Sequence, residues 1–339
     1  MTALTDLPTS PGLWTLAWRR LRADKVAMVS LAIVAAFLAL LVLSASGLVA
    51  ADWEKEVGVN YAPPAFAGDA GMTRAAAVAE APAPDNAFDP LADEIRAIKA
   101  DPHYRAASVD AVRRPTLPFG ADKWGHDIVK KTIKGAETSI VVGLVAATLA
   151  VALGTLFGAV SGFYGGVVDD IFNWFYSIFT SIPSILMILT VAAVLQQKGI
   201  ATIVLILGLT GWTGPYRLIR AEYMKHKARE YVMAADAIGA STWRKMFSHI
   251  FPNVSHVALV QLSILVVGFI KAEVILSFLG FGVPVGTVSW GSMLNEAQNE
   301  LILGKWWQLT AAAMAMALLV TAFSLFTDAL RDALDPKLK

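Results

Sequence analysis

The sequence predicts an all-α, polytopic membrane protein with six transmembrane helices, and three observations support this fold class. Of the 339 residues, 56% are hydrophobic and only 16% are charged, whereas soluble globular proteins carry about 25% charged residues. The mean hydropathy is +0.57. Several charge-free stretches are also long enough to cross a bilayer, because a spanning helix needs roughly 20 apolar residues.

Charge-free windows place the six expected spans in order. They cover residues 26 to about 50, 138–162, 171 to about 195, 199–216, about 254 to 278, and 306–327. The first window is longer than the apolar region of a cleavable signal peptide, so we expect it to remain as a membrane anchor. The fourth window is short, but Lys198 and Arg217 at its ends can extend their charged groups towards water.

Basic residues beside the spans predict the orientation. Four precede the first span: Arg19, Arg20, Arg22 and Lys25. The N-terminus is therefore expected in the cytoplasm, and six crossings return the C-terminus to the same side. The loop 217–253 also falls in the cytoplasm, with seven Lys and Arg against three Asp and Glu. We predict four parts: 1–51 (N-terminus and first span), 52–136, a core at 137–331, and a tail at 332–339.

The segment from 52 to about 135 is expected to face outward. Its first half is rich in Ala and Pro, which is typical of a partly ordered linker. Residues 90–107 predict one short amphipathic helix. Residues 127–139 predict an interfacial helix that leads into the second span.

Five residues inside the spans carry interpretations of their own. Gly154 and Gly158 are four apart, a spacing that lets helices pack closely in lipid. Pro183 is expected to kink the third span, either as part of a gate or simply as shape. Lys271 and Glu273 are ionisable residues in the outer third of the fifth span, where such groups are usually paired or functional. Lys271 can line a pathway or extend to the interface, and Glu273 needs a partner that the sequence does not reveal.

Between the fifth and sixth spans, residues 280–307 are too long for a tight turn and predict an interfacial or re-entrant segment. Trp290, Trp306 and Trp307 fit an aromatic belt at the interface or a shaped outer vestibule. The chain has no Cys, and its five His lack the spacing of metal ligands. No catalytic constellation, metal site or nucleotide-binding glycine motif is present, so any ATP is expected to bind to another chain.

The loop 217–253 is the most informative part of the sequence. Helix-favouring residues lie on both sides of Gly239, and Pro252 is expected to stop the second helix before the fifth span. Ala234 and Ala235, then Gly239, then Pro252 follow the spacing of the cytoplasmic signature of binding-protein-dependent ABC importer permeases, which this loop resembles. Met233 stands where that signature has Glu, although Glu230 lies one turn earlier.

Further segments resemble the dipeptide, oligopeptide and nickel permeases of the second, or C-type, subunit. They lie in the expected order and include the segments at 14–31, 117–144 and 230–253, as well as GFYGGVVDD, IPSIL, LSFLGFGV, SWGSML and LRDALDPKLK. Four departures lie on the outer side: a longer loop after the first span, His126 in place of the common Arg, Lys123–Trp124 in place of smaller residues, and the lack of the common Pro in the segment 303–314.

The resemblance implies a MetI-like permease core of five helices, preceded by an N-terminal anchor helix, in the bacterial inner membrane. It implies coupling helices at 229–252 that contact an ATPase through Glu230, Ala234, Ala235, Asp236, Gly239, Ala240, Ser241, Arg244 and Pro252. The implied partners are a homologous B-type permease, two ATPase subunits that bind ATP and Mg, and an extracytoplasmic solute-binding protein. The implied cargo is peptide, with nickel chelates, glutathione and opines as alternatives. An ion-coupled secondary transporter acting alone is the alternative from another class.

Overall fold

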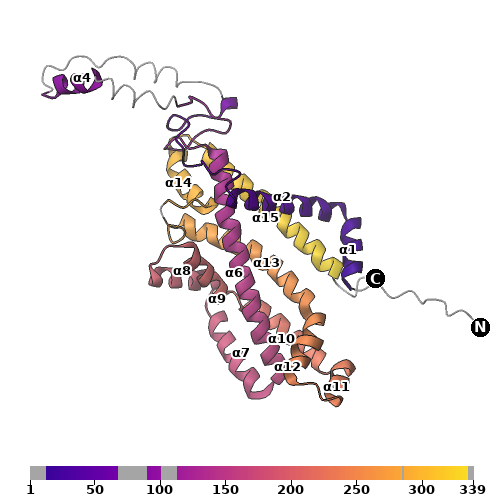
Figure 1. Ribbon diagram of the computed structural model, residues 1–339. Coiled ribbons are helices and arrows are strands. Elements are labelled where there is room, and N and C mark those ends of the chain that lie inside the picture. Colours follow the sequence, from indigo (N-terminus) through magenta and orange to yellow (C-terminus); the bar gives the residue numbers. More distant parts are fainter. Residues whose placement is uncertain (1–12, 68–89, 101–112, 285, 335–339) are drawn as a thin grey trace, which may run out of the picture.

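Helices joined by loops form the described part of the chain, residues 13–67, 90–100, 113–284 and 286–334 of a computed structural model (Figure 1). The N-terminal helices are α1 (Leu13–Ala23), α2 (Lys25–Ala45), the short η1 (Ala65–Ala67) and α4 (Ala92–Ala100). The core helices are α6 (Ile128–Tyr164), α7 (Gly166–Thr180), α8 (Ser184–Leu195), α9 (Ile200–Thr210), α10 (Thr213–Lys227), α11 (Glu230–Ala237), α12 (Thr242–Arg244), the π-helical η2 (Lys245–Ile250), α13 (Phe251–Phe278), α14 (Trp290–Ile302) and α15 (Trp307–Leu334).

Four helical stretches in the described ranges are long and apolar enough to cross a membrane. They are Lys25–Ala45, Ile128–Tyr164, Thr242–Phe278 and Trp307–Leu334, and the bent pair α7 and α8 would make a fifth. The fourth predicted span corresponds to α9, which has only 11 residues before a break at Gly211 and Trp212. The count of six spans and the cytoplasmic position of the termini therefore stay predictions.

α6 is the central helix of the fold and packs against α2, α9, α10, α13 and α15 (Figure 1). It begins after Asp127, whose carboxylate accepts from the Val129 N–H at 2.8 Å. It then continues without interruption for 37 residues. Residues 128–139 are therefore helical and lead directly into the second predicted span, and their position at the membrane interface stays a prediction. At 1.5 Å per residue, α6 is about 55 Å long, and its first turns extend beyond a hydrocarbon layer of about 30 Å.

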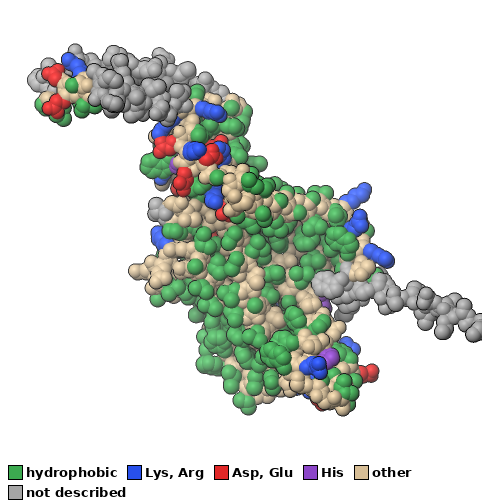
Figure 2. Space-filling view, viewed as in Figure 1, with side chains coloured by type: hydrophobic (Ala, Val, Ile, Leu, Met, Phe, Trp, Pro, Cys, Tyr) green, Lys and Arg blue, Asp and Glu red, His purple; other side chains and the backbone are tan. Residues whose placement is uncertain are grey.

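The third predicted span is broken at the position of its proline. α7 and α8 meet at an angle of 83° across the break, and Pro183 stands directly before α8 with φ of −54°. The predicted kink is confirmed. The main apolar core lies among α6, α9, α13, α14 and α15. Hydrophobic side chains cover most of the visible surface, while charged groups gather towards its ends (Figure 2).

Candidate functional site

The segment 230–252, between α10 and α13, folds as a helix, a turn and a second helix. α11 ends at Ala237, and Gly239 then has φ of +77°, the left-handed region that glycine enters without a Cβ clash. The Ala240 N–H donates to the Ala235 carbonyl at 3.0 Å and closes the turn. Ser241 caps the next helix by accepting a hydrogen bond from its third residue. The predicted helix–Gly–helix is confirmed.

The sequence predicted that Pro252 stops the second helix, and this prediction is wrong. α12, η2 and α13 run as one helix, with Pro252 in the first turn of α13. A proline removes one N–H and crowds the preceding turn, and a wider π-helical turn precedes it here. The Asn253 side-chain amide donates to the His249 carbonyl at 2.8 Å and satisfies an acceptor near the proline. The 230–252 element is therefore directly continuous with the long helix α13.

A separate apolar cluster fixes this element to the rest of the chain. Its buried members are Ala159, Phe163, Ile219, Tyr223, Val232, Met246, Ile250 and Val254. The Tyr223 hydroxyl donates to the Met246 carbonyl in the π-helical turn at 3.1 Å. Lys245 forms an ion pair with Asp236 across the Gly239 turn. Because the cluster includes residues of α6, α10, α11 and α13, a displacement of the element must shift all four helices.

The outward surface of the element is more apolar than expected for a charged loop. Met233, Ile238 and Trp243 are 55%, 85% and 65% exposed. A group of large apolar side chains exposed to water usually marks a contact surface. The predicted contact residues Glu230, Ala234, Asp236, Ser241 and Arg244 are also exposed. Ala235 is only 5% exposed and points into the chain. Sequence reasoning missed Ile238 and Trp243, which flank the Gly239 turn.

A row of glycines binds α6 closely to α10, as the Gly154–Gly158 spacing predicted. A Cβ on Gly154 would lie 2.6 Å from the Trp212 carbonyl oxygen, and one on Gly158 would lie 2.8 Å from the Tyr216 carbonyl oxygen. Gly162 continues the row, with the Arg220 carbonyl oxygen at 2.6 Å. The backbones of the two helices are therefore in direct contact along three turns.

Arg220 also connects α10 to the start of α7. Its Nε and one terminal nitrogen donate to the two carboxylate oxygens of Asp169. Ser161 of α6 donates to the same carboxylate. None of the α7 residues is buried, so this two-pronged ion pair is a main attachment of α7 near the 230–252 element.

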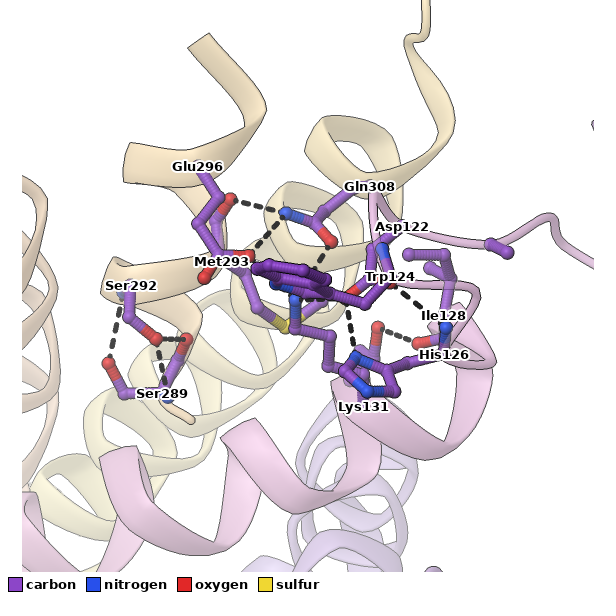
Figure 3. Close-up of polar contacts among 12 residues, drawn as sticks. Asp122, Trp124, His126, Ile128, Lys131, Ser289, Ser292, Met293, Glu296 and Gln308 are labelled. Carbon is purple, nitrogen blue, oxygen red and sulfur yellow. Dashed lines mark hydrogen bonds and ion pairs between the residues drawn. The ribbon is translucent and has the colours of Figure 1, made fainter. Parts of the chain in front are cut away.

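A second polar group, the Lys131 cluster (Asp122, His126, Lys131, Glu296 and Gln308), lies at the other end of α6 (Figure 3). The Lys131 ammonium donates to Asp122 at 2.7 Å, to Glu296 at 2.6 Å and to Gln308 at 3.2 Å. His126 contacts the same Asp122 oxygen through Nδ1 at 2.9 Å. Burial alone would raise the pKa of the Asp122 carboxyl, but the Lys131 ammonium holds that pKa below its usual range. The cluster connects α6, α14, α15 and the preceding loop, and it was not predicted.

Glu300 lies near this cluster without belonging to it. It is 2% exposed, and neither carboxylate oxygen has a partner at ordinary hydrogen-bond distance and angle among the described residues. Burial raises the pKa of Glu300 to about 7; nearby Lys131 and the backbone N–H of Lys123 lower it, while Asp122 and Glu296 raise it. The neutral and ionised forms are thus both accessible near neutral pH. No sequence pattern marks this residue.

The structure separates the candidate pathway residues. Glu273 is fully buried and accepts hydrogen bonds from Ser139 of α6 and Ser277 of α13, both at 2.6 Å. These serines are the partners that the sequence left open. Lys271 is exposed on another face of α13. Pro183 lies in the break between α7 and α8, so the structure does not bring these residues together.

The three tryptophans of the segment 280–307 differ in position. Trp290 and Trp307 are 0% and 4% exposed. Their indole N–H groups donate to the carbonyls of Thr132 and Ala121, at 3.1 Å and 2.6 Å. Trp290 is therefore an internal anchor to α6 and Trp307 to the loop before α6, and the belt interpretation is wrong for both. Only Trp306, at 38% exposure, fits a belt.

Comparison with known proteins gives two family matches and several similar sequences. Residues 154–339 match the family described as "Binding-protein-dependent transport system inner membrane component", and residues 12–64 match the "N-terminal TM domain of oligopeptide transport permease C". The dipeptide transport system permease protein DppC of Lactococcus lactis is 32% identical over 326 residues, which cover 95% of this chain and 90% of that protein. The oligopeptide transport system permease protein OppC of Bacillus subtilis is 38% identical over 221 residues, 65% of this chain and 72% of that protein.

Proposed function

Because this chain belongs to the family of inner-membrane components of binding-protein-dependent transport systems, we propose that it is one permease subunit of an ATP-driven importer of di- and oligopeptides. Similar proteins bear the names of dipeptide and oligopeptide permeases. The observation that carries the ATP-driven part is the 230–252 element, which presents apolar side chains on a folded, anchored turn. A basic loop that was only solvated would need neither the exposed apolar side chains nor the anchored turn.

The proposed assembly has a homologous B-type permease beside this chain, two ATPase subunits beneath it and an extracytoplasmic solute-binding protein. The ATPase contact is assigned to Ile238 and Trp243, with the small residues Ala234, Ala240 and Ser241 allowing close approach. This chain catalyses no reaction, and ATP and Mg bind to the ATPase subunits.

The mechanism follows from how the element is attached. ATP-driven movement of the ATPases displaces the 230–252 element, and its apolar cluster transmits the displacement to α6, α10 and α13. The glycine contacts keep α10 against α6, because separating the two backbones would leave an unfilled gap. The two helices therefore move together. The Arg220–Asp169 ion pair carries the same movement to α7, and the bend at Pro183 then changes the position of α8.

The importer, purified through a tag on this chain, tests the proposal. A cysteine at Ser241 or Ile238 is expected to cross-link to an ATPase subunit, while a control cysteine at Phe66, on the predicted outer side and 65% exposed, is not. Proteoliposomes containing the whole complex should accumulate dipeptide only with ATP and the binding protein. Uptake driven by an ion gradient, by this chain without ATPases, would instead support the secondary transporter. Binding of nickel chelates, glutathione or opines, but no peptide, by the solute-binding protein would correct the cargo.

A further inference from the structure

Two candidate spanning helices, α13 and α15, border an open cavity of about 290 Å³ that is lined by two opposite charges. Lys271 of α13 and Asp328 of α15 both line it, and both side chains are exposed. In the described ranges neither forms an ion pair, with each other or with another residue. Charged groups in spanning helices are costly and usually face a pathway or a partner. These two face the same space but leave it open between them.

Gly268 lies on the same face of α13, one turn before Lys271, and also lines the cavity. Glycine is unfavourable in a helix interior, so its presence there normally answers a packing need. Within the described structure no such need exists, because a Cβ on Gly268 would meet no atom within 4 Å. By contrast, Gly143 and Gly154 elsewhere in the core each face a neighbouring atom at 2.6 Å or less. The open position at Gly268 therefore suits close approach by something outside this chain.

The cavity continues along α13 into a larger one. A second cavity of about 480 Å³ shares Ile264 with the first and is lined by further polar groups, including Glu222, Gln261 and Arg331. The Nδ1 atom of His256, which lines the same cavity, is buried without a hydrogen-bond partner in the described ranges. Polar groups thus follow one face of α13 through two successive cavities, whereas a lipid-facing surface would be uniformly apolar.

We infer that this face of α13 and α15 is a contact surface for the cargo, with Lys271 receiving the carboxylate of a zwitterionic peptide and Asp328 its ammonium group. The peptide backbone would pass over Gly268, where no side chain obstructs it. The inference rests on the proposed function, since it takes peptide as the cargo. Charge complementarity favours this occupant: a free peptide carries both charges, and each otherwise unpaired residue then has a partner.

The absence of cysteine from the chain makes a direct test possible. Single cysteines at Gly268 and Asp328 are introduced in the assembled importer and treated with a water-soluble sulfonate methanethiosulfonate reagent. Leu325→Cys is the control: it lies on α15 and is 43% exposed, but it lines an apolar cavity beside α2. The cysteines at Gly268 and Asp328 should both react, and a transported dipeptide should slow their modification several-fold. Leu325→Cys should react slowly with or without peptide.

Lys271 is tested by substitution. Lys271→Gln should lower dipeptide uptake by roughly tenfold, the effect of losing one charged hydrogen bond, while the amount of assembled complex stays unchanged. Lys271→Arg should retain most of the uptake. If the wild-type complex imports dipeptide but the cysteines at Gly268 and Asp328 do not react, or react equally fast with peptide present, the inference is wrong and the proposed function stands. Cross-linking of Gly268→Cys to the B-type permease without peptide protection would assign the face to that subunit instead. A wild-type complex that imports no peptide would overturn both.

Discussion

Glu300 offers a quantitative test of the packing beside the Lys131 cluster. Its carboxyl is buried without a partner at ordinary hydrogen-bond distance and angle among the described residues, and its pKa is raised from 4.5 to about 7. An acid whose pKa is higher in the folded chain than in the unfolded chain binds its proton more tightly in the fold. Its contribution to stability is therefore best below pH 4.5, declines between pH 4.5 and 7, and is least favourable above pH 7. The full loss corresponds to about 3 kcal/mol.

Glu300→Gln removes this dependence, because the amide has the size of the protonated acid and never ionises. We expect the variant to exceed the wild type by less than about 1 kcal/mol at pH 5 and by about 3 kcal/mol at pH 8.5, where its midpoint of thermal unfolding should be higher by on the order of 5 °C. Intrinsic fluorescence of the ten tryptophans during heating of the purified complex measures the difference. Comparing the two proteins at each pH cancels the contribution of other titrating groups.

Glu296→Gln is the matched control, one helical turn earlier on α14. Glu296 accepts from the Lys131 ammonium at 2.6 Å, so its removal leaves a buried cation with one carboxylate fewer. The control should destabilise the complex at pH 8.5, opposite in sign to Glu300→Gln. A difference between Glu300→Gln and the wild type that stays constant from pH 5 to pH 8.5 would refute the reasoning, since the buried acid would then not titrate in this range.

Substitutions at three further positions test the 230–252 element and its attachment. Gly239→Pro cannot adopt φ of +77° and should abolish peptide-stimulated ATP hydrolysis, whereas Gly239→Ala, with a strain of about 1 kcal/mol, should retain part of it; normal stimulation in the proline variant contradicts the proposed coupling. Asp169→Asn should lower dipeptide uptake and loosen α7, seen as faster hydrogen exchange in its first turns; unchanged exchange would show that Arg220 does not hold α7. Gly158→Leu would place a side chain where the α10 backbone lies at 2.8 Å and should lower the unfolding midpoint by several degrees, and an unchanged midpoint would argue against direct backbone contact.

Hydropathy and spacing were sufficient for features that depend on neighbouring residues. The order of the apolar helices, the break at Pro183 and the turn at Gly239 all follow from local composition and backbone preference. Pro252 was misjudged because a proline signals only a missing N–H, and the π-helical turn that accommodates it has no sequence signature.

Contacts between distant segments were beyond reach of the sequence. Lys131 meets Glu296 and Gln308 across more than 160 residues, and Glu273 meets Ser139 across 134. Each of these residues is ordinary in its local context, and only the helix packing brings them together.

The length of α6 has a consequence for how the two sides of the membrane can move. One end of this helix carries Lys131, and the other carries Ala159 and Phe163 beside the 230–252 element. Because it is uninterrupted over about 55 Å, it acts as a lever with its pivot in the apolar core. A tilt of about 10° moves each end by roughly 5 Å in opposite directions. In the proposed assembly, a push on the 230–252 element would therefore move the Lys131 end of α6 without a separate signal.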